Sequence, residues 1–119
     1  MSVVVPTPGR DVLYRSKTGN YILPAKVSVT IDNLYMPGVR SGDLEDLATP
    51  LHLHLKVINP GPEYVEFNVP HAKMHEDYDA HEEPFPPGTW RWPEMVPDRH
   101  YDIESGTFSG EVLQYAREG

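Results

Sequence analysis

Proline and glycine most constrain how this chain can fold. Thirteen prolines and nine glycines are spread over 119 residues, so one or the other interrupts most of the sequence. Proline fixes φ and removes a backbone donor, which excludes the long helices of a bundle. A doubly wound α/β sheet is excluded as well, because helical patterns of sufficient length are missing. The chain therefore favours short extended segments joined by turns.

Two alternating runs predict a β-hairpin in the middle of the chain. Apolar residues occupy every second position in 51–57 and again in 64–69, and an Asn-Pro-Gly-Pro turn at 59–62 separates the runs. A third run, 25–31, predicts a half-buried strand beside the hairpin. Its expected inward residues are Ala25, Val27, Val29 and Ile31. These patterns predict a mainly β fold, a small, partly open SH3-like barrel or sandwich of five to six short strands.

The chain reads as one domain over residues 1–119. Its core is expected at about 8–96, and residues 97–119 fit a C-terminal arm. Residues 109–117 suit either a short helix capped by Ser109 or a final strand. A further helical turn is expected over 41–47 with Ser41 as its N-cap.

The charge is acidic and unevenly distributed. The net charge is −8, and residues 41–83 hold ten acidic against two basic groups. A nucleic-acid partner is therefore not expected, because phosphate binding needs a basic face. No apolar run approaches the length of a membrane span, and the first residues lack the pattern of a signal peptide. Together with the absence of cysteine, this pattern leads us to expect an intracellular, reducing compartment.

An aromatic and acidic stretch is the first candidate for partner binding. Trp90 and Trp92 would share one face of a strand, with Phe85 and Tyr78 nearby, as a platform for a proline-rich or other protein partner. Two tryptophans can equally form the core of a small domain. Five acidic residues form a second candidate for partner binding, as a face that docks on a basic surface: Glu76, Asp77, Asp79, Glu82 and Glu83. The competing interpretation is that they belong to a solvated loop.

The histidines are the candidates for a metal site. His52 and His54 lie two apart on a predicted strand, so their side chains would be ~6–7 Å apart on one face. His71 follows downstream as a further ligand candidate for zinc, iron or nickel. The competing interpretation places His52 and His54 on the solvent face of a strand whose leucines face the core.

Motifs for nucleophilic or nucleotide chemistry are missing from the sequence. It contains no Gly-x-Ser-x-Gly, no Walker loop and no dinucleotide fingerprint. We therefore expect no catalytic residues and no cofactor.

The order of motifs resembles a group of small uncharacterised proteins encoded by actinobacterial phages and prophages. The resemblance lies in a Pro-Gly segment leading to Val-Leu-Tyr at 8–14, a Pro-Ala strand at 23–27, the central hairpin, and the closing Pro-Gly-Thr-Trp-x-Trp-Pro at 87–93. It covers roughly residues 6–96, while the loop 32–50 and the extension 97–119 depart from the pattern. The resemblance implies a phage-related source and a small β-rich domain, and it brings no activity or cofactor.

Three functions follow as hypotheses. The first is a small acidic phage-encoded interaction module without catalytic activity, which binds a protein partner encoded by the host. The second is a structural virion accessory protein of the capsid or tail. The third is a metal-dependent enzyme that uses His52 and His54. A homodimer is compatible with each of them, since a small sheet leaves edges to cover.

Overall fold

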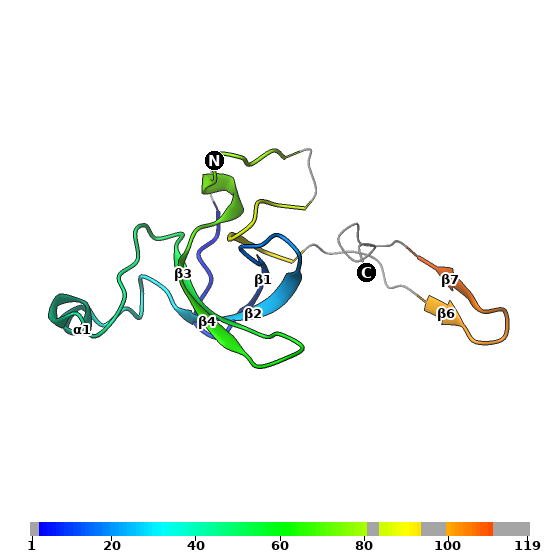
Figure 1. Ribbon diagram of the computed structural model, residues 1–119, viewed down its shortest axis with the longest axis horizontal. Helices are drawn as coiled ribbons and strands as arrows, with labels where there is room; N and C mark the ends of the chain where they lie inside the picture. Colours follow the sequence, from blue (N-terminus) through cyan, green and yellow to red (C-terminus); the bar gives the residue numbers. More distant parts are fainter. Residues whose placement is uncertain (1–2, 81–83, 94–99, 111–119) are drawn as a thin grey trace.

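A five-stranded antiparallel sheet forms the body of the protein (Figure 1). The computed structural model describes residues 3–80, 84–93 and 100–110. The sheet has the order β4-β3-β2-β1-β5. Its strands are β1 (Asp11–Arg15), β2 (Ile22–Val29), β3 (Leu53–Val57), β4 (Tyr64–Val69) and β5 (Trp90–Arg91). The predicted mainly β fold and the central hairpin are confirmed.

The sheet curls until its two ends meet. Just after β4, His71 forms a parallel bridge with Trp90 in β5, and the Trp90 amide donates to the Pro70 carbonyl at 3.1 Å. This junction of residues 70–71 with β5, which we call the seam, joins the outer strands at one end of the sheet. The body is therefore a small, partly open β barrel.

The barrel interior is packed with apolar side chains from every strand. The core cluster consists of Val12, Tyr14, Leu23, Ala25, Val27, Leu53, Leu55, Val57, Val69 and Trp90. The predicted inward position of Ile31 is wrong, because Ile31 lies beyond β2 and is exposed. The register of β2 shifts between Val27 and Val29, and a turn in which the Thr30 hydroxyl accepts from the Asp32 amide ends the strand. Thr30 is consequently the buried residue at this end.

Strand β4 does not bury its alternating apolar residues over most of its length. Val65 and Phe67 are 50% and 55% exposed, whereas Tyr64 and Glu66 are half-buried. Asn68 has a φ of 53°, and the pairing of β3 with β4 shifts register between Leu53 and Leu55. This irregularity returns Val69 to the core, because one extra residue in a strand reverses the side-chain alternation.

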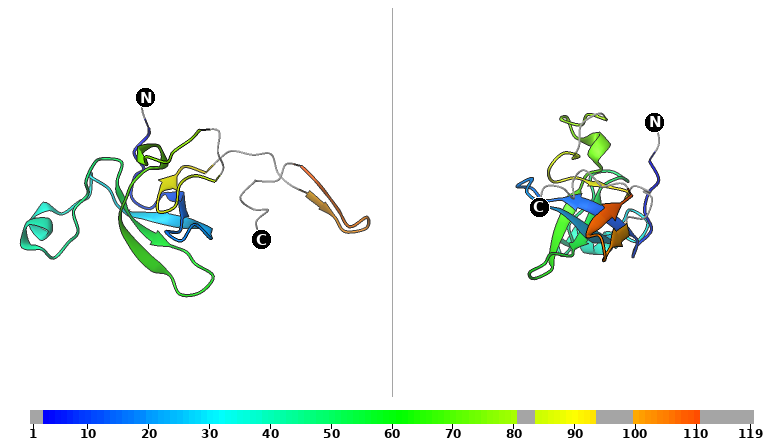
Figure 2. Two further views of the ribbon diagram at one scale, coloured as in Figure 1. Left: turned by 45° about the horizontal axis from the view of Figure 1, so that its top comes forward. Right: turned by 90° about the vertical axis from the view of Figure 1, so that its right-hand side faces the viewer.

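A long connection from β2 to β3 carries the helix α1 (Met36–Ser41) away from the barrel (Figures 1 and 2). Pro37 occupies the first turn, where its missing amide is harmless. Gly42 ends the helix in the left-handed conformation with φ 84°. The prediction of a helical turn that starts at Ser41 is therefore wrong, because Ser41 is the last residue of the helix.

A second, two-stranded sheet lies at the other end of the molecule (Figure 1). It pairs β6 (His100–Asp102) with β7 (Thr107–Ser109), and every residue in both strands is exposed. Ser109 is the last residue of β7; the predicted helix or strand beyond Gly110 lies outside the described residues. Within the described ranges, no helix is long and apolar enough to cross a membrane.

Candidate functional site

A cavity of about 360 Å³ opens beside the seam of the barrel. Seven of its eleven lining residues are apolar or aromatic, and the other four are two cationic residues, one carboxylate and an imidazole. The lining residues are Val3, Val4, His71, Ala72, Lys73, Tyr78, Asp79, Ala80, Phe85, Arg91 and Trp92. This size and composition are typical of a site that takes a small apolar group.

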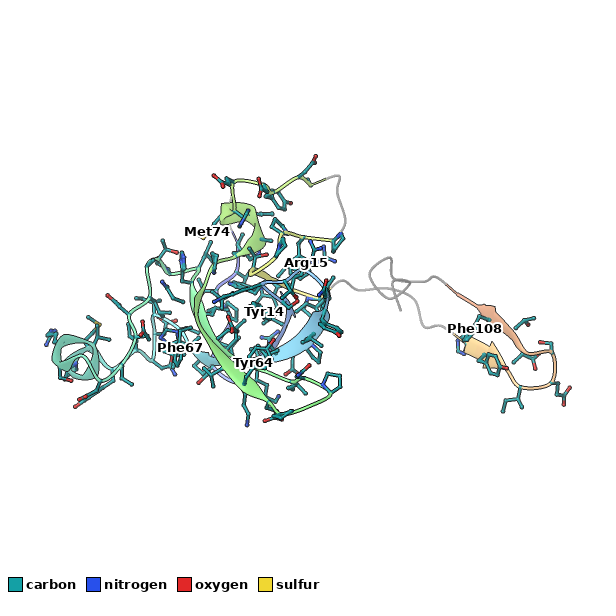
Figure 3. The ribbon with its side chains drawn as sticks, viewed as in Figure 1. Tyr14, Arg15, Tyr64, Phe67, Met74 and Phe108 are labelled. Atoms are coloured by element: carbon teal, nitrogen blue, oxygen red, sulfur yellow. The ribbon has the colours of Figure 1, made fainter. Side chains whose placement is uncertain are left out.

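The cavity is built by segments far apart in the sequence. The 3-10 helix η1 (Ala72–Met74) supplies one wall, and His71 caps it by accepting from the Lys73 amide at 3.0 Å. Figure 3 labels Met74 on this turn above the barrel. On the opposite side, the Trp92 indole donates to the Val4 carbonyl at 3.1 Å, which fixes the N-terminal segment against β5.

The predicted aromatic platform is divided between the core and the cavity. Trp90 is 0% exposed and donates to the Leu51 carbonyl at 2.9 Å, so it belongs to the core. Trp92 is half-buried, packs edge-on against Trp90 at 6.1 Å between ring centroids, and lines the cavity. Phe85 is buried under the Arg91 guanidinium, 4.9 Å from its ring centroid, and presents one side to the cavity. The aromatic groups near a partner would therefore be Trp92, Phe85 and Tyr78.

The acidic residues follow η1 on the surface. Glu76, Asp77 and Asp79 are exposed, and Asp79 lines the cavity. The Asp77 amide donates to His75 Nδ1 at 3.0 Å, which orders this turn locally. Glu82 and Glu83 lie outside the described residues.

The two paired histidines do not point to a common site. His54 is buried; its Nδ1 accepts from the Asn68 amide at 2.9 Å, and its Nε2 lies 2.9 Å from the Glu45 carbonyl. Because a carbonyl can only accept, the hydrogen bond to Glu45 is donated by Nε2. Both nitrogens are thus engaged by the backbone. The prediction of a solvent-facing His54 is wrong, since the backbone of Glu45 and Asn68 and the ring of Phe67, 5.2 Å away between ring centroids, cover its side chain.

His52 and His71 are engaged elsewhere. His52 Nδ1 lies 2.7 Å from the Thr49 hydroxyl, and burial lowers the pKa of His52. Burial, with a smaller effect from the cation of Lys73, lowers the pKa of His71 from 6.5 to about 4. In the part of the chain that the structure describes, no three residues of the His, Asp, Glu or Cys types come together as a metal-binding group.

One polar cluster has no signal in the sequence pattern. The Tyr14 hydroxyl donates to the Glu66 carboxylate at 3.1 Å, and Lys17 pairs with the same oxygen at 3.2 Å. Figure 3 labels Tyr14 within the barrel and Tyr64 on the green strand β4. Burial and the charge of Glu66 raise the pKa values of both Tyr14 and Tyr64. The Tyr14–Glu66 hydrogen bond links β1 to β4, two strands that are not neighbours in the sheet, which is a structural role.

The cavity is thus the feature with the geometry of a binding site, while the histidines and the Glu66 cluster satisfy internal groups. Comparisons of the chain with protein-family models, with curated proteins and with solved structures gave no significant match.

Proposed function

We propose that this protein is a small phage-encoded interaction module without catalytic activity. Its cavity would take an apolar segment of a protein partner, which we expect to be host-encoded. The observation that carries the proposal is the 360 Å³ cavity, walled by three aromatic side chains from different segments. Aromatic side chains around a pocket are the usual anchors of a protein contact. The phage source depends on the sequence resemblance alone.

The finer description of the fold is part of the same proposal. The strand order β4-β3-β2-β1-β5, with the 3-10 helix η1 between β4 and β5, supports an SH3-like barrel. The cavity lies against η1, so the turn that leads to the closing strand would form part of the binding surface.

The test is to fill the cavity from its exposed rim. Ala80 is exposed and lines the cavity, so Ala80→Trp should occupy it without disturbing the core. Ala48→Trp makes the same change at an exposed position outside the cavity lining. Capture from an actinobacterial host lysate should retain a discrete protein with the wild type and with Ala48→Trp, and lose it with Ala80→Trp. Binding of the purified partner should then follow the same order by calorimetry.

Two outcomes would count against the proposal. If the wild type retained no protein, or if the wild type and both tryptophan variants retained the same protein equally, the cavity would not be the binding site. A third variant, with Glu76 and Asp77 each changed to Lys, separates the contribution of the acidic turn, because neither residue lines the cavity. If only this variant lost the partner, the acidic residues rather than the cavity would be the binding surface.

A virion accessory role is the second candidate, and the β6–β7 hairpin favours it. All six strand residues of this hairpin are exposed, and it lies away from the barrel in Figure 1. A two-stranded hairpin is marginally stable alone, so an exposed one gains from contact with another subunit. Mass spectrometry of purified particles tests this role, and absence of the protein from them would eliminate it.

A further inference from the structure

The imidazole of the cavity wall holds a hydrogen-bond donor that the described residues do not use. His71 lines the cavity and is only 5% exposed. Its Nδ1 accepts from the Lys73 amide at 3.0 Å, so this nitrogen carries no proton. The proton of the ring is therefore on Nε2, because an imidazole keeps at least one N–H. Among the described residues, no acceptor forms a hydrogen bond with Nε2 of His71.

This donor reaches the cavity and is held in place by the barrel. Nε2 of His71 is not among the fully enclosed polar atoms that lack a hydrogen bond in the described ranges, so it contacts accessible space. The accessible space beside this nearly buried residue is the cavity. The ring packs edge-on against Trp90 at 4.6 Å between centroids, and its backbone bridges to the same residue. The direction of the N–H is therefore fixed before a ligand arrives.

An unused donor in a mainly apolar wall determines which ligands fit. A purely apolar group that displaces water from the cavity leaves the Nε2–H of His71 without an acceptor, and this costs affinity. A ligand that places an acceptor on this N–H avoids the cost. The best ligand therefore combines an apolar group with a single acceptor beside it.

The surrounding charges favour an uncharged acceptor over a carboxylate. The two cations of the lining, Lys73 and Arg91, already have partners. Asp79 lines the cavity, and Glu76 and Asp77 are exposed on the same turn. A carboxylate on the ligand would add a like charge beside these residues, whereas a carbonyl would not.

We propose that Nε2 of His71 donates to a backbone carbonyl of the partner segment whose apolar side chain fills the cavity. A peptide carbonyl is uncharged and lies next to the side chain of its own residue, so one residue supplies both groups. His71 thereby selects a peptide group over a purely apolar one. This inference rests on the proposed function, because it takes the cavity to be the binding site.

Three small probes test the choice of acceptor. Benzamide carries an uncharged carbonyl, benzoate a carboxylate and toluene no acceptor, while all three share the ring that fills the cavity. Binding to the full chain is measured by NMR, from the shifts of the backbone amides around the cavity. The wild type should bind benzamide more tightly than benzoate, and the Nε2 proton of His71 should shift with benzamide alone. Ala80→Trp should abolish binding of all three, and Ala48→Trp should leave it unchanged.

Two variants separate the two nitrogens of His71. His71→Asn keeps an acceptor near the position of Nδ1, so it still caps η1 but removes the donor in the cavity. His71→Gln places its amide nitrogen near the position of Nε2 and so keeps a donor there. His71→Asn should weaken benzamide about threefold to tenfold and leave toluene unchanged, because it removes one hydrogen bond. His71→Gln should retain the affinity for benzamide, although it lacks the cap.

The remaining outcomes distinguish this inference from the proposed function. If toluene and benzamide both bind and His71→Asn affects them equally, the carbonyl contact is refuted while the cavity remains an apolar binding site. Tighter binding of benzoate than of benzamide would also refute the uncharged acceptor. If no probe shifts the cavity amides, the inference fails, and the proposed function then depends on whether Ala80→Trp loses the captured partner. If that variant still retains the partner, both fail.

Discussion

Acid should destabilise this protein through His71, at the seam of the barrel. Burial lowers the pKa of this imidazole from 6.5 to about 4. In the unfolded chain the same group binds its proton near 6.5, so between these two pH values the unfolded state holds more protons. Stability is therefore complete above pH 6.5 and falls as the pH drops towards 4. Each pKa unit is equivalent to about 1.4 kcal/mol, so the loss can reach about 3 kcal/mol.

The geometry gives the reason for this cost. Nδ1 of His71 accepts from the Lys73 amide, and a protonated nitrogen cannot accept. The imidazole also packs edge-on against Trp90 at 4.6 Å between ring centroids, where a charge would lose hydration. Protonation would therefore weaken both the η1 cap and the closure of the barrel.

The assay is urea unfolding, followed by tryptophan fluorescence between pH 7.5 and 4.5. The matched variant is His71→Asn, because the asparagine oxygen can still accept from the Lys73 amide but does not titrate. His52, whose pKa burial also lowers, is present in both proteins and cancels in the difference. The free energy of unfolding should fall more steeply for the wild type, by up to about 3 kcal/mol over this range. Parallel pH profiles would refute the reasoning.

Three further predictions concern the core, the Glu66 cluster and the connection between β2 and β3. Trp90→Ala should lower the free energy of unfolding by about 3–5 kcal/mol in urea titrations, because the side chain is fully buried and donates a hydrogen bond. Glu66→Ala should cost about 1–3 kcal/mol because it removes the acceptor of the Tyr14 hydroxyl, and a double-mutant cycle with Tyr14→Phe should show that the two losses are less than additive. Gly38→Ala should speed hydrogen exchange in the connection between β2 and β3, and adding Leu44→Ala should restore protection because it removes the atom that the new Cβ meets at 2.6 Å.

Controls for these variants come from the same chain. Tyr101→Ala changes an exposed ring in the β6–β7 hairpin and should alter the free energy of unfolding by no more than about 0.5 kcal/mol. A Trp90→Ala loss no larger than that of Tyr101→Ala would contradict the core assignment. Strict additivity of Glu66→Ala and Tyr14→Phe would contradict the coupling across the barrel.

Local pattern was sufficient to predict the hairpin and the mainly β class. Leu53, Leu55 and Val57 alternate without interruption and are all fully buried. The same rule failed at Val65 and Phe67, because the inward neighbour between them, Glu66, is stabilised by Tyr14 and Lys17 from another part of the chain. Such partners become neighbours only after the sheet has curled, so a period-2 pattern cannot predict them.

The candidate site was predictable in composition rather than in arrangement. The sequence indicated an aromatic cluster with acidic neighbours, and the structure places Tyr78, Phe85 and Trp92 around one cavity. The sequence could not predict that Trp90 belongs to the buried core while Trp92, two residues later, is only half-buried. That difference comes from the seam, where the backbone of Pro70 pairs with Trp90. The sequence could not predict that Val3 and Val4 line the cavity either. Their position depends on the hydrogen bond from the Trp92 indole to the Val4 carbonyl, which joins residues near the two ends of the barrel sequence.

The order of the strands has a consequence for how the chain folds during synthesis. The first four strands are sheet neighbours in the order in which they are made, so each can pair as soon as the next one is available. Strand β5 departs from this order, since its two residues must pair with β1 at the far side of the sheet. Contacts between distant parts of a chain form slowly, because a long loop must close first. When residues 11–69 of a nascent chain have left the ribosome, the core of the sheet therefore stays uncovered until Trp90 has been made and packs against it. During this interval the exposed apolar surface makes the protein vulnerable to aggregation.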